Sequence, residues 1–264
     1  LLMREALYSV HFPQSMAQIE KAHDRLLLDD MVYFAMSNEY AARSSSTGSP
    51  FNIKTLGTIK EITENLPYQL TIDQQDTVNS MIQKVREGKR LNALVQGDVG
   101  CGKTIVAILM MAVLAENGYL AMIMTAENGY QAVLMAPTQV LAKQHYADLC
   151  AILEPVGFHI AYLGSNMKVK EKKAVLASIA SGEANIIVGT HSVIGKSVEY
   201  KNLGITVTDE EHKFGVAQRA ALVEKAAAGV HSITMSATPI PRTLAQVIYG
   251  SAIDLYTIQT MPAG

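Results

Sequence analysis

The chain has 264 residues, of which 49% are apolar, so it is long enough for one large domain with a sizeable core. Its formal net charge is −2, which excludes a strongly basic protein and restricts any contact with DNA to a local patch. The two cysteines, Cys101 and Cys150, are too few for a disulfide framework, and no apolar run is long enough to span a membrane. We therefore expect a cytoplasmic protein without membrane contact.

The first predicted element is helical. Apolar residues recur at helical spacing between residues 15 and 42, and Ser15 and Gln18 fit a capping box at the start. The stretch from Arg43 to Pro50, RSSSTGSP, has the composition of a flexible linker. The predicted domains are a helical connecting segment with a linker at residues 1–65 and a main domain at residues 66–264.

From residue 66 onward, short apolar runs alternate with helical runs. Continuous apolar strands separated by helices are typical of an α/β fold with a mostly parallel sheet flanked by helices. Such sheets bind ligands at the carboxyl ends of their strands. The predicted strands are 91–96, 131–135, 159–163, 186–189, 204–208 and 232–235, and the predicted helices are 103–116, 139–153, 168–180 and 216–228.

The pentapeptide AENGY occurs at residues 115–119 and again at 126–130, followed by the similar runs LAMIM and QAVLM. Only one copy can form the strand that leads into residues 136–138. We expect the second copy to form it, because this copy joins those residues without a gap. Eleven residues make about three helical turns, so the first copy could extend the preceding helix in phase. However, Asn117-Gly118 is typical of a helix end, so we expect a non-helical excursion instead.

Residues 97–104, GDVGCGKT, fit the phosphate-binding pattern G-x-x-x-x-G-K-[ST] between a predicted strand and a predicted helix. Glycines let backbone N–H groups surround phosphate oxygens, and the helix N-terminus adds a partial positive charge. A glycine-rich turn without a ligand is the alternative, which this context disfavours. The pattern predicts ATP and Mg²⁺ as cofactors, with Lys103 on the phosphates and the Thr104 hydroxyl on the metal. The cofactor-binding residues of the loop would be Gly97, Gly100, Gly102, Lys103 and Thr104.

A second acidic motif, Asp209-Glu210-Glu211-His212, follows the predicted strand 204–208. A P-loop enzyme needs one acid at the end of a second strand to hold Mg²⁺ and another to orient water. Asp209 fits the first role and Glu210 the second. An acidic turn that only closes the strand is the alternative, and the accompanying phosphate-binding loop disfavours it.

The order of these motifs resembles that of superfamily 2 helicases, with residues 209–212 as the DExH motif. Residues 66–74 resemble the segment that reads adenine, and 136–145, 189–191 and 236–238 resemble further helicase motifs. Residues 11–13, HFP, resemble the segment that joins a wedge domain to a motor. The resemblance covers nearly the whole chain, although the repeated AENGY unit is not part of the family pattern. The longer strings that are similar to the RecG family are QGDVGCGKT, MAPTQVLAKQHY, VGTHSVI, DEEHKFGVAQR and SATPIPRTLA.

This resemblance implies a RecA-like lobe, the first motor lobe of an ATP-dependent DNA helicase that acts on branched DNA, such as stalled forks and Holliday junctions. The implied partners are branched duplex DNA and two parts of the same protein, a second motor lobe and a wedge domain. The lobe alone is then expected to be poorly active. The resemblance implies catalysis by Lys103, Asp209 and Glu210, adenine contact by Gln74, and DNA contact or coupling by Thr138, Thr190, His191, His212, Ser236, Thr238 and Arg242.

Several of these residues have a structural alternative. Thr138 is a good N-cap for the next helix, Gln74 could be a surface residue, and Arg242 could form a salt bridge. Two other functions also stay open. One is the motor lobe of a transcription-repair coupling factor, which Gln96 and the HFP segment disfavour. The other is a non-motor P-loop nucleotide-binding module, which the further helicase motifs disfavour.

Overall fold

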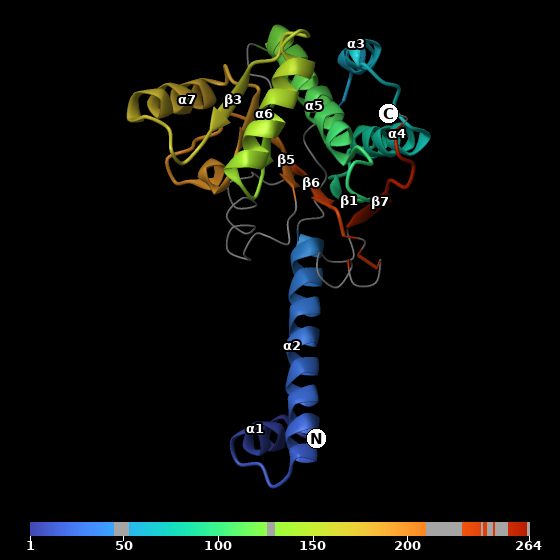
Figure 1. Cartoon of the computed structure of the whole chain (residues 1–264), viewed down its shortest axis with the longest axis vertical. Coiled ribbons are helices and arrows are strands. Elements are labelled where there is room, and N and C mark those ends of the chain that lie inside the picture. Colours follow the sequence, from blue (N-terminus) through green and yellow to red (C-terminus); the bar gives the residue numbers. More distant parts are fainter. Residues whose placement is uncertain are drawn as a thin grey trace. The chain divides into compact units, whose positions relative to one another are not determined.

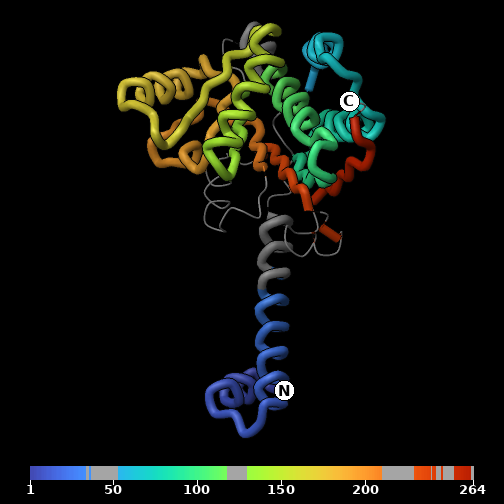
Figure 2. Tube along the Cα trace, viewed as in Figure 1, coloured from blue at the N-terminus to red at the C-terminus, as the bar shows by residue number. Residues whose placement is uncertain are grey.

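The computed structural model describes residues 1–44, 53–125, 130–209, 229–238, 240–241, 245 and 253–262, which form two compact units (Figures 1 and 2). The first unit contains α1 (Met3–His11) and α2 (Met16–Ser44). Ser15 accepts a hydrogen bond from the backbone N–H of Gln18 at 3.3 Å, as the capping prediction requires. α2 continues through Arg43 and Ser44, so the predicted linker is wrong for these two residues.

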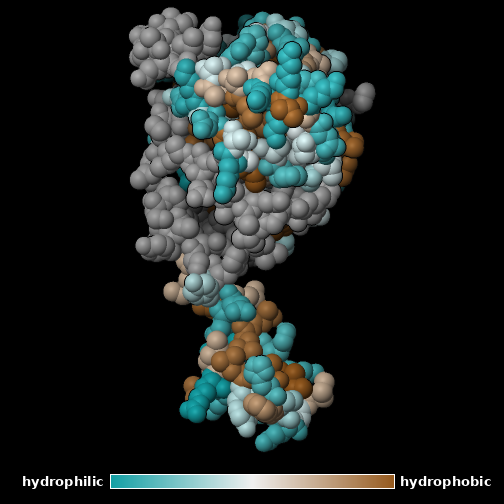
Figure 3. All heavy atoms as spheres, turned by 90° about the vertical axis from the view of Figure 1, so that its left-hand side faces the viewer, coloured by the Kyte–Doolittle hydropathy of each residue, from teal (hydrophilic) through white to brown (hydrophobic). Residues whose placement is uncertain are grey.

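The two helices of the first unit pack through small side chains. Ala6 of α1 and Ala22 of α2 are fully buried, which lets the helix backbones approach closely. Many larger apolar side chains of this unit are exposed, and Figure 3 shows them as brown areas among hydrophilic ones. They include Leu2, Leu7, Val10, Phe12 and Met16.

The second unit is built on a seven-stranded sheet with the order β3-β4-β2-β5-β6-β1-β7 among the described residues. Every strand pair in it is parallel. The predicted fold class, an α/β lobe with a parallel sheet flanked by helices, is therefore confirmed. The strands are β1 (Asn92–Gln96), β2 (Gln131–Met135), β3 (Ile160–Leu163), β4 (Ile186–Gly189), β5 (Leu203–Asp209), β6 (His231–Ser236) and β7 (Asp254–Thr257).

The sheet is covered on both faces. In β2, Ala132 and Leu134 belong to one buried cluster, whereas the alternate residues Val133 and Met135 belong to another. Successive side chains of a strand point to opposite faces, so two core clusters mean two covered faces. The covering elements are α3 (Gly57–Asn65), α4 (Ile72–Arg86), α5 (Lys103–Thr125), α6 (Gln139–Leu153), α7 (Val169–Ser181) and the 3₁₀ turn η1 (His191–Ile194).

The second AENGY copy supplies the strand, as predicted. β2 begins at Gln131, between β4 and β5, and its C-terminal end leads directly into residues 136–138. Buried Gln131 also joins three segments. Its Nε2 donates to the carbonyl oxygens of Ile179 and Ala184, both at 2.9 Å, and its Oε1 accepts from the backbone N–H groups of Lys201 (2.8 Å) and Asn202 (3.3 Å).

The prediction of a non-helical excursion for the first copy is wrong. α5 continues through Asn117 and Gly118 to Thr125. Asn117 does not end the helix, because its side chain is occupied by tertiary contacts. Its Nδ2 donates to the carbonyl of Val113 one turn earlier at 2.7 Å and to that of Thr55 at 3.0 Å. Its Oδ1 accepts from the N–H groups of Lys54 (2.5 Å) and Thr55 (2.9 Å).

α3 lies within the second unit, although the predicted domain boundary places it in the connecting segment. It contacts α5 and α6, and its buried Ile62 belongs to the main core cluster. The carboxylate of Glu116 on α5 accepts the backbone N–H of Thr58 at 3.3 and 3.4 Å, at the first turn of α3. The predicted helix 216–228 lies outside the described residues. No helix in the described ranges is long and apolar enough to cross a membrane.

Candidate nucleotide-binding site

Residues 97–102 form the loop between β1 and α5, at the carboxyl end of the sheet. Gly100 and Gly102 have φ angles of +87° and +82°, a region that residues with a Cβ rarely adopt. A Cβ on Gly97 would collide with the carbonyl oxygen of Ile258, and one on Gly102 would collide with Nε2 of Gln74. The fixed glycines of the motif are therefore required by backbone shape and by close packing.

Lys103 begins α5 and folds back over the loop. Its Nζ donates to the carbonyl oxygens of Gly97 at 2.8 Å and Asp98 at 2.9 Å. The ammonium group is thus held at the loop by carbonyl groups and stays partly accessible. Thr104 follows it and lines a neighbouring pocket. An ammonium, a helix N-terminus and a glycine-rich turn together form a cradle for phosphate groups.

Gln74 is fully buried, so the alternative of a surface residue is wrong. Its Oε1 accepts the backbone N–H of Thr71 at 2.9 Å and completes a capping box at the start of α4. Its Nε2 donates to the carbonyl of Cys101 in the phosphate-binding loop, also at 2.9 Å. The amide therefore braces the loop against α4.

A segment that the sequence analysis missed borders the same loop. Asp73, next to Gln74, accepts hydrogen bonds from the backbone N–H groups of Thr260 (2.8 Å) and Gln259 (2.9 Å) and from the Thr260 hydroxyl (2.9 Å). These hydrogen bonds, led by that of the Thr260 N–H, lower the pKa of the Asp73 carboxyl. The segment after β7 is thereby fixed beside Gly97. A short, partly exposed edge strand gives little periodic signal, which is why β7 was not predicted.

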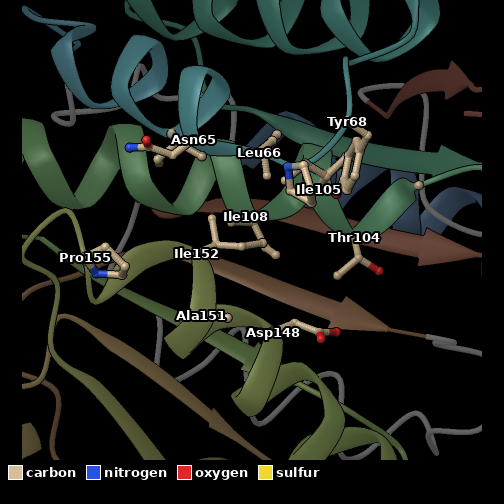
Figure 4. A pocket seen from close by; sticks show the side chains of 13 residues that line it. Asn65, Leu66, Tyr68, Thr104, Ile105, Ile108, Asp148, Ala151, Ile152 and Pro155 are labelled. Carbon is tan, nitrogen blue, oxygen red and sulfur yellow. The ribbon is translucent and has the colours of Figure 1, made fainter.

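A pocket of about 660 Å³ opens next to the loop, between the segment after α3 and the facing sides of α5 and α6 (Figure 4). Its walls are largely apolar, and Asp148 and Tyr68 contribute polar groups at its edge. Partial burial and the nearby Asp148 carboxylate raise the pKa of the Tyr68 hydroxyl. The apolar lining includes Ile62, Leu66, Ile105, Ile108 and Ile152.

The acidic motif begins at Asp209, the last residue of β5. Asp209 pairs in register with Met235, the residue before Ser236, which pairs in register with Gln96 of β1. The ends of β5, β6 and β1 therefore bring Asp209, Ser236 and the phosphate-binding loop to one edge of the sheet. Oδ2 of Asp209 lies 2.8 Å from Nε2 of His145 on α6, a neighbour that the sequence analysis did not single out for this place. Glu210, His212 and Arg242 lie outside the described residues.

The predicted DNA-contact and coupling residues stand at several strand ends. Thr138 is exposed and caps α6, with its Oγ1 accepting the N–H of Leu141 at 3.3 Å, so the capping alternative holds. His191 is exposed, but Thr190 is buried, and its hydroxyl has no hydrogen-bond partner among the described residues. Ser236 is buried and hydrogen-bonds within its own turn, 3.0 Å from the carbonyl of Thr238.

The loop after β3 is a polar neighbour that the motif analysis did not select. Ser165 accepts a hydrogen bond from Nε2 of Gln139, the first residue of α6, at 2.5 Å. Ser192 donates to the carbonyl of Leu163 at 2.5 Å, which connects the loops after β3 and β4. The loops after β2, β3 and β4 therefore form one continuous polar edge. The residues of this edge follow no recognisable spacing in the sequence, so the sequence alone did not indicate it.

The fold and the site define the class of protein. The family model of DEAD/DEAH box helicases matches residues 71–247, and the chain belongs to this family. This match disfavours the alternative function of a non-motor P-loop nucleotide-binding module.

More specifically, the chain is similar to proteins named ATP-dependent DNA helicase RecG. The Mycobacterium tuberculosis protein is 36% identical over 275 residues, 98% of this chain and 36% of that protein. The Borreliella burgdorferi protein is 35% identical over 264 residues, 100% of this chain and 36% of that protein. The resemblance stated from the motifs is thus confirmed, and the chain spans little more than a third of the length of these relatives.

Solved structures agree with this assignment. A structure of RecG bound to a three-way DNA junction matches 98% of this chain and 33% of that chain, with a TM-score of 0.70 and 30% identity. A DEAD box protein from Methanococcus jannaschii matches 80% of this chain and 54% of that chain, with a TM-score of 0.56 and 20% identity. The second likeness shows the shared RecA-like fold alone.

Proposed function

We propose that the chain from α3 onward is the ATP-binding first lobe of a cytoplasmic DNA helicase or translocase that acts on branched DNA in recombination and repair, with α1 and α2 as its connecting segment. The observation that carries the proposal is the phosphate-binding loop, with Lys103 folded over it and Asp209 at the same sheet edge. The similarity to RecG proteins supports the choice of branched DNA as substrate.

The residues of the loop fit a nucleoside triphosphate. Lys103 contacts only neutral carbonyl oxygens and a thiol among the described residues, and phosphate oxygens would be stronger acceptors for its ammonium group. The Thr104 hydroxyl and the Asp209 carboxylate are oxygen ligands of the kind that Mg²⁺ prefers. When bound, the metal would neutralise charge on the β- and γ-phosphates.

The pocket beside the loop suits the base of the nucleotide. It shares Gly102 and Thr104 with the phosphate cradle, and its apolar walls match an aromatic ring. Gln74 has both ends of its amide engaged, so we assign it a bracing role between α4 and the loop and no direct contact with adenine. Asn65, Tyr68 and Asp148 contribute polar groups that are available to the base.

Catalysis would combine three groups of this chain. Lys103 holds the phosphates, Asp209 holds the metal, and Glu210 activates the attacking water. A cationic group that stabilises the transition state is commonly supplied in trans, and we assign it to a second motor lobe. The chain alone would then bind ATP weakly and hydrolyse it slowly.

DNA would contact the polar edge formed by the loops after β2, β3 and β4. The exposed Thr138 and His191 suit phosphate contacts, because hydroxyl and backbone N–H groups at loop ends commonly bind DNA phosphates. We assign Thr190, Ser236 and Thr238 to coupling between this edge and the ATP site, together with His212 and Arg242. The wedge domain of the full-length protein is the proposed further partner on branched DNA.

The test is ATP hydrolysis with forked DNA, by the full-length protein and by this chain. We expect DNA-stimulated turnover only in the full-length protein, and Lys103→Ala should abolish it there, because the phosphates lose their ammonium partner. Lys143→Ala, which changes an exposed lysine of α6, is the matched control and should keep most of the turnover. Normal turnover by Lys103→Ala would refute the assignment of the loop.

DNA binding by this chain gives a second readout. Since the net charge is −2, affinity must come from a small strip of phosphate contacts and should be weak and strongly dependent on salt. Fluorescence anisotropy of labelled forked DNA across a salt series measures it. Tight binding that does not change with salt would contradict the proposed DNA edge.

A further inference from the structure

His145 occupies an unusual position on α6. It is only 6% exposed, and its Nε2 lies 2.8 Å from Oδ2 of Asp209, the acidic residue at the end of β5. Its other ring nitrogen, Nδ1, is buried and has no hydrogen-bond partner within the described part of the chain. The ring therefore reaches the acidic motif with one nitrogen, and none of the described residues pairs with the other.

Packing alone does not explain a histidine at this place. A carboxylate can only accept hydrogen bonds, so Nε2 must carry the hydrogen that faces Asp209. Leaving a polar atom buried without a partner costs free energy, and a phenylalanine or leucine would fill similar space without that cost. The hydrogen bond to Asp209 is the property that only the histidine supplies.

We propose that His145 is a positioning residue for the metal-holding carboxylate. By donating to Oδ2, the ring fixes the rotation of the Asp209 side chain before Mg²⁺ binds. Side chains that orient a metal ligand in this way commonly change metal affinity 10- to 100-fold when removed. The inference rests on the proposed function of Asp209 and goes beyond it, because it assigns a residue outside the acidic motif to the metal site.

The position of His145 also connects two parts of the lobe. α6 begins next to Thr138 on the proposed DNA edge and carries His145 about two turns further along. A rigid helix moves as one body, so a shift at its N-terminal end would also move the donor that holds Asp209. The hydrogen bond therefore links the DNA edge to the metal site through a single helix.

The test measures binding of a fluorescent ADP analogue to the 264-residue chain while Mg²⁺ is titrated. His145→Phe keeps a ring of similar shape without the donor, and His145→Gln keeps an amide donor. We expect the Mg²⁺ concentration for half-maximal binding to rise about tenfold in His145→Phe and to return most of the way in His145→Gln. Binding in EDTA should be equal in all three proteins.

Leu149→Ala is the control for general loosening of α6. Leu149 is fully buried one turn further along the same helix, and its truncation should lower the melting temperature without changing the Mg²⁺ midpoint. An unchanged midpoint in His145→Phe, or an equal shift in Leu149→Ala, overturns the inference and leaves the proposed function intact. Absence of Mg²⁺-dependent binding by the unmodified chain would refute the proposed function, and the inference with it.

A second measurement needs no variant. Long-range ¹H–¹⁵N NMR of the histidine rings reports which ring nitrogen of His145 carries hydrogen in the folded chain. We expect hydrogen on Nε2, because this nitrogen faces the Asp209 carboxylate. An Nε2 without hydrogen would overturn the inference even if a variant failed to fold.

Discussion

Residues 115–125 and 126–135 begin with the same pentapeptide, yet the chain uses them in different ways. The first copy lies inside α5, where Glu116 and Asn117 contact the segment before and at the start of α3. The second copy leads into β2, where Gln131 connects this strand to two other segments. The same five residues thus lie inside a helix in one place and lead into a buried strand in the other. The contacts around each copy therefore decide which structure follows.

The position after the pentapeptide shows the physical reason. The first copy has Leu120 there and the second has Gln131. At the start of β2, the glutamine side chain donates to two carbonyl oxygens and accepts from two backbone N–H groups. Leucine can form none of these four hydrogen bonds, so the second copy is the better strand even though both copies are apolar.

The largest expected effect comes from giving β2 the residue of the first copy. Gln131→Leu should lower the free energy of unfolding by about 4 kcal/mol, because several buried backbone groups lose their partner. Urea unfolding followed by circular dichroism measures this loss. Gln131→Glu keeps the acceptor but not the donor. Its free energy of unfolding should lie between that of the unmodified chain and that of Gln131→Leu. A loss below about 1 kcal/mol for Gln131→Leu would remove the proposed reason for the choice of copy.

A somewhat smaller loss is expected when the helical copy is changed. Asn117→Ala removes four hydrogen bonds, three of which hold residues 54–55 against α5, and should cost about 3 kcal/mol in the same assay. Asn117→Asp keeps the acceptor oxygen and should cost less. Equal losses in the two variants would mean that the bonds accepted from the N–H groups of Lys54 and Thr55 contribute nothing.

Glu116 should matter less, because its carboxylate lies at the partly exposed start of α3. Glu116→Gln removes a negative charge near the positive end of the α3 dipole and should cost about 0.5–1 kcal/mol. Thermal unfolding at low and high salt measures this loss, which should shrink at high salt. A loss that stays constant with salt would contradict an electrostatic origin.

The smallest effect is expected from removing one repeat unit. Deleting residues 115–125 joins Leu114 to a single AENGY followed by the β2 residues, so both sets of contacts can still form. The change in unfolding free energy should stay within about 1 kcal/mol, since the remaining copy supplies the same five residues ahead of β2. Deleting residues 125–135 removes the same number of residues but places LAMIM in the sheet, and it should destabilise about as strongly as Gln131→Leu. Similar stabilities of the two deletions would show that the copies are interchangeable.

Much of the fold follows from local sequence. β1, β2 and β4 carry apolar residues on both faces, and the apolar runs between helical stretches therefore predicted a parallel sheet. The glycines, lysine and threonine of residues 97–104 predicted the phosphate-binding loop, because its backbone shape and charge depend on those residue types at that spacing. The family followed from the order of the motifs along the chain.

Other features depend on residues far apart in the sequence. Nothing near Asn117 indicates that residues 54–55 will occupy its side chain, and so the helix end predicted at Asn117-Gly118 was wrong. Nothing near Gln74 in the sequence indicates that its amide will bond to Cys101, 27 residues further along the chain. Local propensity is worth only about 1 kcal/mol per residue, and a few tertiary hydrogen bonds to a buried side chain exceed it.

The sequence by itself determined the parallel α/β fold, the phosphate-binding loop and the place of Asp209 at a strand end, because periodicity and motif spacing encode them locally. Only the tertiary structure decided which repeat copy became the strand, what Gln74 holds, and that His145 stands against Asp209, 64 residues further along the chain. These features are hydrogen bonds between segments, and a buried donor or acceptor takes its partner from whichever segment folding brings within about 3 Å.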